Sequence, residues 1–470
     1  MTPGADIRAR GERQRKIIVV GHGAAGLCAA LSAAEAAQER GIEARVTIVE
    51  RAAAAACGGG SRYSPSNIRM LAPDAMESGF VDQVVEASSG RADRAYFERL
   101  AAQAPATARW LQSKGVAFHT PPYYLAKGPA RIQPVGDIGA LYAALSRSAQ
   151  AAGIEVLYEH PLRRLLLDEG KVVGAEVGAA PTVLRADAVV LASGGFEGNG
   201  AMLRQYMGPG GESLRPISPG TAQNDGGGIR AALDAGALPS GDWSGMHIEP
   251  VDARSRGSAP VVLVYPYGIV VDRLGRRFFD EGRGLMHETW ERFSRDIHFA
   301  LPGRIAYAIL DASLLDIPEY GRAIRSEVPP VRADSIPELA AQLGIPAAAL
   351  TQTVNSYNAA CSGDAARFDE TRKDGLATAP SLSPPKSNWA RTLARPPYLA
   401  WPLVGAIAYT FGGIASDPDA RVLGAGGPIR GLYAAGEITG HFYGTAPNAV
   451  AMLRALVFGR IAGRNAIEPV

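Results

Sequence analysis

A glycine-rich turn near the start of the chain has the residue spacing that binds the phosphates of a dinucleotide. Gly21, Gly23 and Gly26 stand between a β-branched run at residues 16–20 and an alanine-rich segment. In such a G-x-G-x-x-G pattern the first glycine makes a tight turn, the second lets the backbone approach a pyrophosphate, and the third lets the following helix pack on the strand. The phosphates lie at the N-terminus of that helix. The predicted phosphate-binding residues are Gly21, Gly23, Ala24, Ala25 and Gly26.

An acidic residue and a second glycine-rich loop extend this nucleotide site. Glu50 ends the predicted strand at residues 45–49, where its carboxylate can accept hydrogen bonds from ribose hydroxyls. The loop that follows can wrap a second phosphate with its backbone N–H groups and reach a redox ring. The predicted binding residues of this part are Glu50, Arg51, Gly59, Gly60 and Ser61. The alternative is a βαβ unit whose glycines serve only turns.

Later segments add the motifs of a flavin site. They read DAVVLASGGFEGN at 187–199, TAQNDGGGIRAALDAGA at 221–237, LYAAGE at 432–437 and NAVAMLRALVFGRIAG at 448–463. In this order they resemble the flavoprotein family of fumarate reductase and succinate dehydrogenase, and within it the tricarballylate dehydrogenase-like enzymes. The resemblance implies bound FAD. It is concentrated in the cofactor-binding segments and is weak through the middle of the chain.

Two of these segments have a direct physical interpretation. Glu437 follows a short buried strand, where its carboxylate can bind ribitol hydroxyls, although an acid of a surface turn is the alternative. Asn448 suits the N-cap of the final helix, whose positive end would face the flavin pyrimidine and stabilise negative charge on reduced FAD. The further predicted cofactor-binding residues are Ser193, Gly194, Gly195, Asn224, Asp225, Gly436, Glu437, Asn448, Ala449 and Val450.

The elements that must position these residues predict an α/β fold. The resemblance implies a Rossmann-like FAD-binding domain of the GR2 type, discontinuous over residues 1–246 and 398–470, and an inserted α+β capping domain at 247–397. The middle of the chain has its own predicted strand at 267–272 and predicted helices at 335–344 and 346–361. In succinate dehydrogenase a histidine of the flavin loop carries FAD covalently. Residues 59–63 contain no histidine, so the resemblance implies noncovalent FAD here.

Histidines and tyrosines stand where this family clamps substrate carboxylates with histidine and arginine. His247 in SGMHIEPV matches the first clamping histidine, Tyr409 replaces the later one, and Arg283 lies near the family's first arginine but out of register. The last loop offers His441 and Tyr443 in place of an arginine. Bidentate guanidinium pairing makes arginine good at holding carboxylates. Its loss argues against a dicarboxylate or tricarboxylate and favours a larger or less charged substrate with a carbonyl or ring.

The chemistry that follows is proton removal beside a carbonyl, with hydride transfer from the neighbouring carbon to flavin N5, or the reverse. A base with a pKa near the working pH is best, which points to His247, His441 or His287. Tyr409 or Tyr443 would then be a proton donor or oxyanion partner, and Arg283 is either part of the site or a surface charge. A flavin oxidase or hydroxylase that uses oxygen, and a noncatalytic electron-transfer subunit that binds FAD, are the alternatives.

Composition restricts the remaining partners. The formal net charge of the 470 residues is +2, so no basic field draws nucleic acid. The three cysteines form no C-x-x-C pair, which predicts neither a metal site nor a disulfide framework. No run approaches the roughly 18 apolar residues of a membrane span, and the start lacks a signal-peptide core. We therefore expect a cytoplasmic location and a separate electron acceptor: a quinone, a redox protein or oxygen.

Overall fold

The computed structural model describes residues 14–121, 125 and 131–468, and its first sheet is of the dinucleotide-binding type. Strand β1 (Arg15–Val20) pairs in parallel with β2 (Ala44–Val49) on one side and β9 (Ala188–Leu191) on the other. Strands buried on both faces need almost continuous apolar sequence, which β1 and β9 have. The outer strands are β5 (Glu155–Leu157), β18 (Arg421–Gly424) and β19 (Gly427–Ala434), in the order β18-β19-β9-β1-β2-β5.

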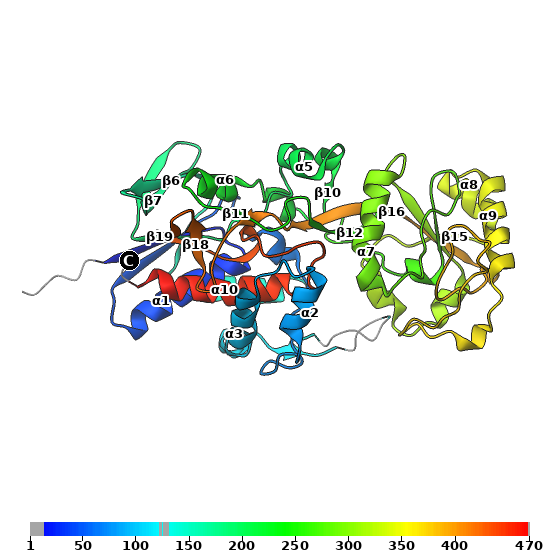
Figure 1. Cartoon of the computed structure of the whole chain (residues 1–470), viewed down its shortest axis with the longest axis horizontal. Helices are drawn as coiled ribbons and strands as arrows, with labels where there is room; N and C mark the ends of the chain where they lie inside the picture. Colours follow the sequence, from blue (N-terminus) through cyan, green and yellow to red (C-terminus); the bar gives the residue numbers. More distant parts are fainter. Residues whose placement is uncertain (1–13, 122–124, 126–130, 469–470) are drawn as a thin grey trace, which may run out of the picture.

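Two helices that are far apart in the sequence pack closely on each other beside this sheet. Helix α1 (Ala24–Glu39) lies against α10 (Ala451–Ala466), as Figure 1 shows. Small residues at the contact allow it, because a side-chain carbon placed at Gly463 would lie 2.1 Å from the carbonyl oxygen of Ala29. Helix α3 (Arg94–Ser113) packs on the other side of α10. The two ends of the chain therefore build one nucleotide-binding unit.

A second six-stranded sheet contains one long strand, β16 (Tyr398–Thr410), that runs between the two ends of the molecule (Figure 1). Its first residues pair with β14 (Ala306–Leu310) and β15 (Val331–Ala333), and its later residues pair with β10 (Arg215–Pro216). β12 (Met246–Asp252) runs antiparallel beside it. Because Tyr409 lies near the far end of β16, this strand carries it towards the first sheet.

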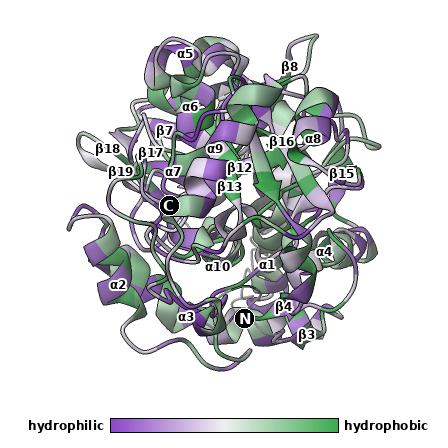
Figure 2. Ribbon diagram, turned by 90° about the vertical axis from the view of Figure 1, so that its right-hand side faces the viewer, coloured by the Kyte–Doolittle hydropathy of each residue, from purple (hydrophilic) through white to green (hydrophobic). Residues whose placement is uncertain are grey.

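The other helices and strands complete the two sheets. Figure 2 shows mostly hydrophobic residues along the central strands and more hydrophilic residues on outlying helices such as α2. The further helices are α2 (Phe80–Ala87), α4 (Ala140–Ala151), α5 (Gly200–Met207), α6 (Gly227–Asp234), α7 (Met286–Arg295), α8 (Ile336–Leu343) and α9 (Ala347–Ala360). The further strands are β3 (Phe118–His119), β4 (Gln133–Pro134), β6 (Leu162–Asp168), β7 (Lys171–Val177), β8 (Thr182–Arg185), β11 (Pro239–Ser240), β13 (Ile269–Val271) and β17 (Gly413–Ile414).

The predicted α/β class, with a Rossmann-like sheet and a second α+β part, is confirmed. The predicted division at residues 247 and 397 falls at the starts of β12 and β16 and stays a prediction. One local prediction is wrong: α10 begins at Ala451 with Val450 as its N-cap, so Asn448 precedes the cap. Within the described ranges, no helix combines the length and apolar character needed to cross a bilayer.

Candidate active site

A cavity of about 340 Å³ joins the glycine turn after β1 to residues of the second sheet. All of the predicted cofactor-binding residues line it except Gly26, Gly195 and Val450. Among the predicted catalytic residues, His247, His287 and Tyr409 line it. The structure thus brings most of the predicted cofactor-binding residues and three of the six predicted catalytic residues together around one space, although they come from distant parts of the chain.

Close contacts require glycine at two positions of the turn, Gly21 and Gly26. Gly21 has a φ of +107°, and a side-chain carbon there would lie 2.4 Å from the carbonyl oxygen of Ala192. A side-chain carbon at Gly26 would lie 1.9 Å from the carbonyl oxygen of Gly21. Gly26 therefore serves helix packing, as the third glycine of the pattern should, which explains why it does not line the cavity.

Two hydrogen bonds hold the Glu50 carboxylate in place at the end of β2. The carboxylate accepts hydrogen bonds from the backbone N–H groups of His22 at 2.9 Å and Ala52 at 2.8 Å. Burial lowers the pKa of His22 to about 4. The His22 imidazole is therefore neutral beside the phosphate turn, where it contacts the Tyr142 hydroxyl at 3.0 Å. Ser61 joins the second loop to the start of α1 by accepting the Ala24 N–H at 3.1 Å.

Arg51 ties two of the predicted cofactor loops together. Its guanidinium lies 2.7 Å from the Asp225 carboxylate and donates to the Gln223 carbonyl at 2.8 Å. Both partners are partly exposed, so this pair fixes geometry more than it adds stability.

Two carboxyl groups meet where the flavin ribityl chain was predicted to bind. Asn224 Nδ2 donates to Glu197 at 3.0 Å and to Glu437 at 3.4 Å, and Glu437 also accepts the Thr410 N–H at 2.9 Å. A side-chain carbon at Gly195 would lie 2.1 Å from Glu437, so only glycine fits between them. Burial, and then the neighbouring Glu437, raise the pKa of Glu197 well above its usual range. Glu197 therefore holds its proton to higher pH than a glutamate in water does.

This protonated acid predicts a dependence of stability on pH. In the unfolded chain Glu197 ionises near pH 4.5, whereas in the folded protein it stays protonated to much higher pH. The folded state then binds more protons, so the free energy of unfolding falls as pH rises above about 4.5, by up to about 1.4 kcal/mol per pH unit for each retained proton. Glu197→Gln should reduce this slope. Urea unfolding of the FAD-free protein between about pH 5 and pH 8 measures it. The exposed Glu98→Gln variant should leave the slope unchanged, and an unchanged slope in Glu197→Gln would contradict a proton retained by Glu197.

Buried donors without partners show that this end of the cavity fits a ligand rich in acceptors. Asn448 Nδ2 and the Nε and Nη2 atoms of Arg454 are buried and have no hydrogen-bond partner among the described residues. Both residues line the cavity. Because an unmet buried donor is costly, these groups are suited to the carbonyl oxygens and ring nitrogens of a flavin. The loop at Gly59–Tyr63 (GGSRY) offers no histidine for covalent attachment.

His247, which lines the same cavity, stands between two carboxylates. Its Nδ1 lies 2.5 Å from Glu291 of α7, and its Nε2 lies 3.0 Å from Glu249 of β12. Thr445 donates to the second oxygen of Glu291 at 2.9 Å, which fixes that carboxylate. Burial alone would lower the pKa of His247, but the two carboxylates outweigh it and raise the pKa to about 10. The raised pKa favours the imidazolium form of His247 at neutral pH, which suits a proton donor better than the predicted base.

Two aromatic rings pack against the His247 imidazole. Tyr409 stacks on His247 with ring centroids 4.7 Å apart, and Trp290 approaches edge-on at 5.7 Å. Burial raises the pKa of Tyr409 well above its ordinary value, so its hydroxyl keeps the proton and can donate a hydrogen bond. His287 also lines the cavity, but burial lowers its pKa to about 4, which makes it a weak base.

The structure does not bring three of the predicted catalytic residues to the cavity. His441 is buried, contacts the Ser416 hydroxyl at 2.9 Å and stacks on Tyr96, and burial lowers its pKa to about 3. The Tyr443 hydroxyl accepts the Gly241 N–H at 3.2 Å. Arg283 is exposed on the surface. These residues lie near the family's motif positions in sequence, but His441 packs in the interior, Tyr443 holds a turn and Arg283 faces solvent.

Residues that the sequence did not single out line the cavity instead. They are Arg131, Glu249, Arg325 and Arg454. The absence of the family's clamping arginines from their motif positions therefore does not leave the cavity without arginine, because arginines from other positions line it. Arg454 had a detectable signal, as a lone charge in the apolar run at 449–459. Arg325 had none.

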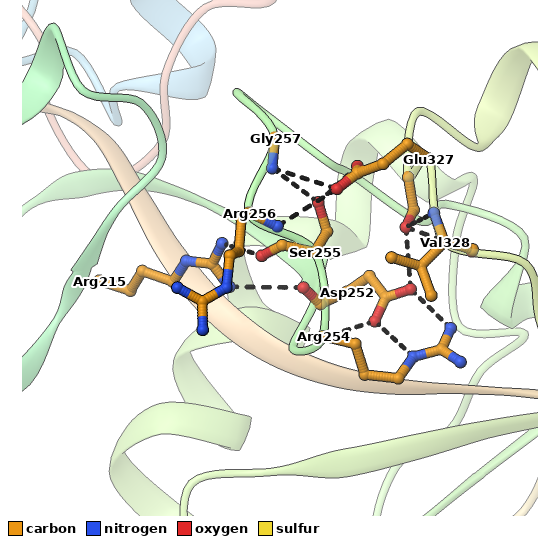
Figure 3. A network of polar contacts seen from close by, with 9 residues as sticks. Arg215, Asp252, Arg254, Ser255, Arg256, Gly257, Glu327 and Val328 are labelled. Carbon is orange, nitrogen blue, oxygen red and sulfur yellow. Dashed lines mark hydrogen bonds and ion pairs between the residues drawn. The ribbon is translucent and has the colours of Figure 1, made fainter.

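A polar network, part of which Figure 3 shows around Asp252 and Glu327, holds the segment that follows Arg325. The backbone N–H of Arg325 donates to Val261 at 2.8 Å, and the next residue, Ser326, donates to the fully buried Asp252 at 2.9 Å. Arg254 pairs with the same carboxylate at 2.7 Å. Figure 3 also shows Glu327 accepting hydrogen bonds from the loop that follows β12; the donors are the Ser255 hydroxyl and the Arg256 and Gly257 N–H groups. Among the described residues Arg325 itself has no ion pair, so its charge remains available to the cavity.

Comparisons with known proteins identify the family. Residues 16–450 match the family model described as FAD binding domain. An NADH:acrylate oxidoreductase of Vibrio harveyi is 29% identical over 79% of this chain, which spans 37% of that protein. A 4-oxocyclohexanecarboxylate 2-dehydrogenase of Sinomonas cyclohexanicum is 30% identical over 69% of this chain and 60% of its own length. A flavocytochrome c3 fumarate reductase structure matches with a TM-score of 0.79 and 25% identity, over 97% of this chain and 79% of that one. The chain belongs to the FAD binding domain family, alongside fumarate reductases and related flavoproteins, which confirms the predicted family, FAD cofactor and oxidoreductase class.

Proposed function

We propose that this chain dehydrogenates or reduces a carbon–carbon bond next to a carbonyl or carboxylate, in a substrate that carries a carboxylate together with a carbonyl or ring. The observation that carries the proposal is the shared cavity, because predicted FAD-binding residues and His247, Glu249, Tyr409 and Arg325 all line it. FAD, when bound, supplies the hydride acceptor or donor. Noncovalent FAD is part of this proposal.

The substrate proton is exchanged at the Glu249–His247 pair. Burial alone would raise the pKa of Glu249, but the hydrogen bond from His247 holds it below its usual range. Glu249 is thus a carboxylate that lines the cavity, backed by an imidazolium whose Nε2 lies 3.0 Å away. In the reductive direction the Nε2 proton passes to Glu249 and then to the substrate carbon. In dehydrogenation the Glu249 carboxylate takes the proton from the substrate carbon.

Two groups orient the substrate for this exchange. The Tyr409 hydroxyl donates a hydrogen bond to the carbonyl oxygen and stabilises the negative charge that develops there. Arg325 binds the carboxylate, because a guanidinium without an ion partner gains most from an anion. The keto acid named for the Sinomonas cyclohexanicum relative carries both of these groups on one ring, which supports this substrate class.

Anaerobic mixing tests the proposal with three matched probes. 4-Oxocyclohexanecarboxylate has a ketone and a carboxylate, cyclohexanone lacks the carboxylate, and cyclohexanecarboxylate lacks the ketone. We expect the flavin absorbance to bleach fastest with the first compound. The reverse arm mixes dithionite-reduced enzyme with unsaturated keto acids. If dithionite bleaches the flavin normally but no carbonyl or carboxylate compound changes its absorbance in either direction, the proposal is wrong.

The electron acceptor and the cytoplasmic location stay predictions. A separate quinone, a redox protein or oxygen would complete the cycle. Stoichiometric peroxide formation on aeration of the reduced enzyme would identify oxygen as that acceptor, and cell fractionation would check the location.

A further inference from the structure

Arg454 is a buried cation, and its burial destabilises the folded protein when no ligand is bound. Its side chain is 1% exposed, and only its Nη1 has a hydrogen bond among the described residues, to the Thr439 carbonyl at 3.1 Å. The guanidinium lies 3.9 Å from the ring of Phe442, while Nε and Nη2 have no partner among the described residues. Burial of an unmet charge of this kind costs stability.

The position of Arg454 in its helix adds to this cost. Arg454 lies four residues into α10, so its charge opposes the positive end of the helix dipole. Ala451 and Ala455, on the same face of the helix, line the cavity with it. Neither Glu437 nor any other described carboxylate lies within ion-pair distance of Arg454. The buried guanidinium therefore lacks a partner in the protein. A ligand in the cavity that carries a negative charge or carbonyl oxygens would supply it.

We propose that Arg454 binds the pyrimidine side of the FAD ring and raises the reduction potential of the bound flavin. This inference rests on the proposed function. Two electrons and one proton convert oxidised FAD to a singly negative reduced form, whose charge spreads over the pyrimidine. The N-terminus of α10 is proposed to face that part of the ring. A guanidinium there stabilises the reduced form more than the oxidised form, which makes the flavin a stronger oxidant.

The test measures properties of the bound flavin in the absence of substrate. Arg454→Met removes the charge and keeps much of the volume. We expect the two-electron midpoint potential to fall by about 30 mV or more, which is a tenfold change in the redox equilibrium. Sulfite, which adds to oxidised flavin when nearby positive charge stabilises the product, should bind at least about tenfold more weakly. FAD-free Arg454→Met should melt at a higher temperature than the FAD-free wild type, because the unmet charge is gone.

Control variants distinguish an arginine that binds the flavin from one that binds substrate or only packs. Arg460→Met removes an arginine from the same helix but outside this cavity, and it should leave the potential and sulfite affinity unchanged. If Arg454→Met does not fold, Arg454→Lys should stay closer to the wild type in both measurements than Arg454→Gln. Unchanged potential and sulfite affinity in a variant that holds FAD would overturn the inference. So would a rise in substrate KM with no change in either flavin property, because the guanidinium would then bind substrate. Absence of FAD from the wild type would refute the proposed function instead.

Discussion

Replacing His247 by glutamine is expected to lower kcat about 10²- to 10⁴-fold, the usual contribution of a positioned proton donor. Glutamine can still hydrogen-bond to Glu249 and Glu291 but cannot carry a proton between them. FAD binding should remain, because none of the predicted FAD-binding residues is changed. Single-turnover bleaching of the flavin with and without substrate measures both properties on one sample.

The pH dependence of the reaction separates proton donation from simple positioning. Because the pKa of His247 is raised to about 10, kcat/KM in the reductive direction should stay high at neutral pH and fall as pH rises through that value. Glu291→Gln removes one of the two carboxylates that raise the pKa, so the fall should move to lower pH. The exposed His119→Gln variant should leave both the rate and the pH profile unchanged. A His247→Gln enzyme with wild-type kcat would remove this residue from the proton path.

Replacing Arg325 by methionine is expected to raise KM for a keto acid about 10- to 100-fold, with a smaller effect on kcat. The loss of a charge-assisted hydrogen bond, about 1.5 to 3 kcal/mol, sets this range. Steady-state kinetics with 4-oxocyclohexanecarboxylate measure it. Arg283→Met, which removes an exposed arginine outside the cavity, is the matched control and should leave KM unchanged.

A neutral substrate analogue shows whether the carboxylate is the group that Arg325 binds. With the carboxamide in place of the carboxylate, the wild type and Arg325→Met should have similar KM values. Arg325→Lys should recover only part of the affinity for the acid, because lysine lacks the planar fork. An equal rise in KM for the acid and the amide in Arg325→Met would show that Arg325 shapes the cavity without binding the carboxylate charge.

The cofactor half of the site could be predicted from the sequence because its motifs are local. The spacing of Gly21, Gly23 and Gly26 specifies backbone contacts within one turn, and Glu50 follows directly from the end of the next strand. The error at Asn448 came from placing the helix start by residue preference, whereas the structure begins α10 three residues later with no side-chain cap.

The substrate half could be predicted only in part because it depends on packing between distant segments. His247 and Tyr409 are paired residues on the neighbouring strands β12 and β16. Both were found by their match to the family's motifs, and the strand pairing explains why they meet. Glu291 contacts His247 from α7. Arg325 is positioned by a network that joins residues 252–257 to residues 326–328. No spacing of residues in the sequence predicts either set of contacts. The raised pKa of His247 could likewise not be predicted, because it depends on two carboxylates that only the fold brings to the imidazole.

Bleaching of the FAD-loaded, desalted protein by substrate in the absence of oxygen tests the proposed chemistry most directly. We expect a stoichiometric, noncovalent flavin whose visible band is lost on adding a keto acid, and a band that persists when His247→Gln is mixed with the same compound. A protein that stays colourless after refolding with FAD, or a flavin that responds equally in both proteins, would refute it.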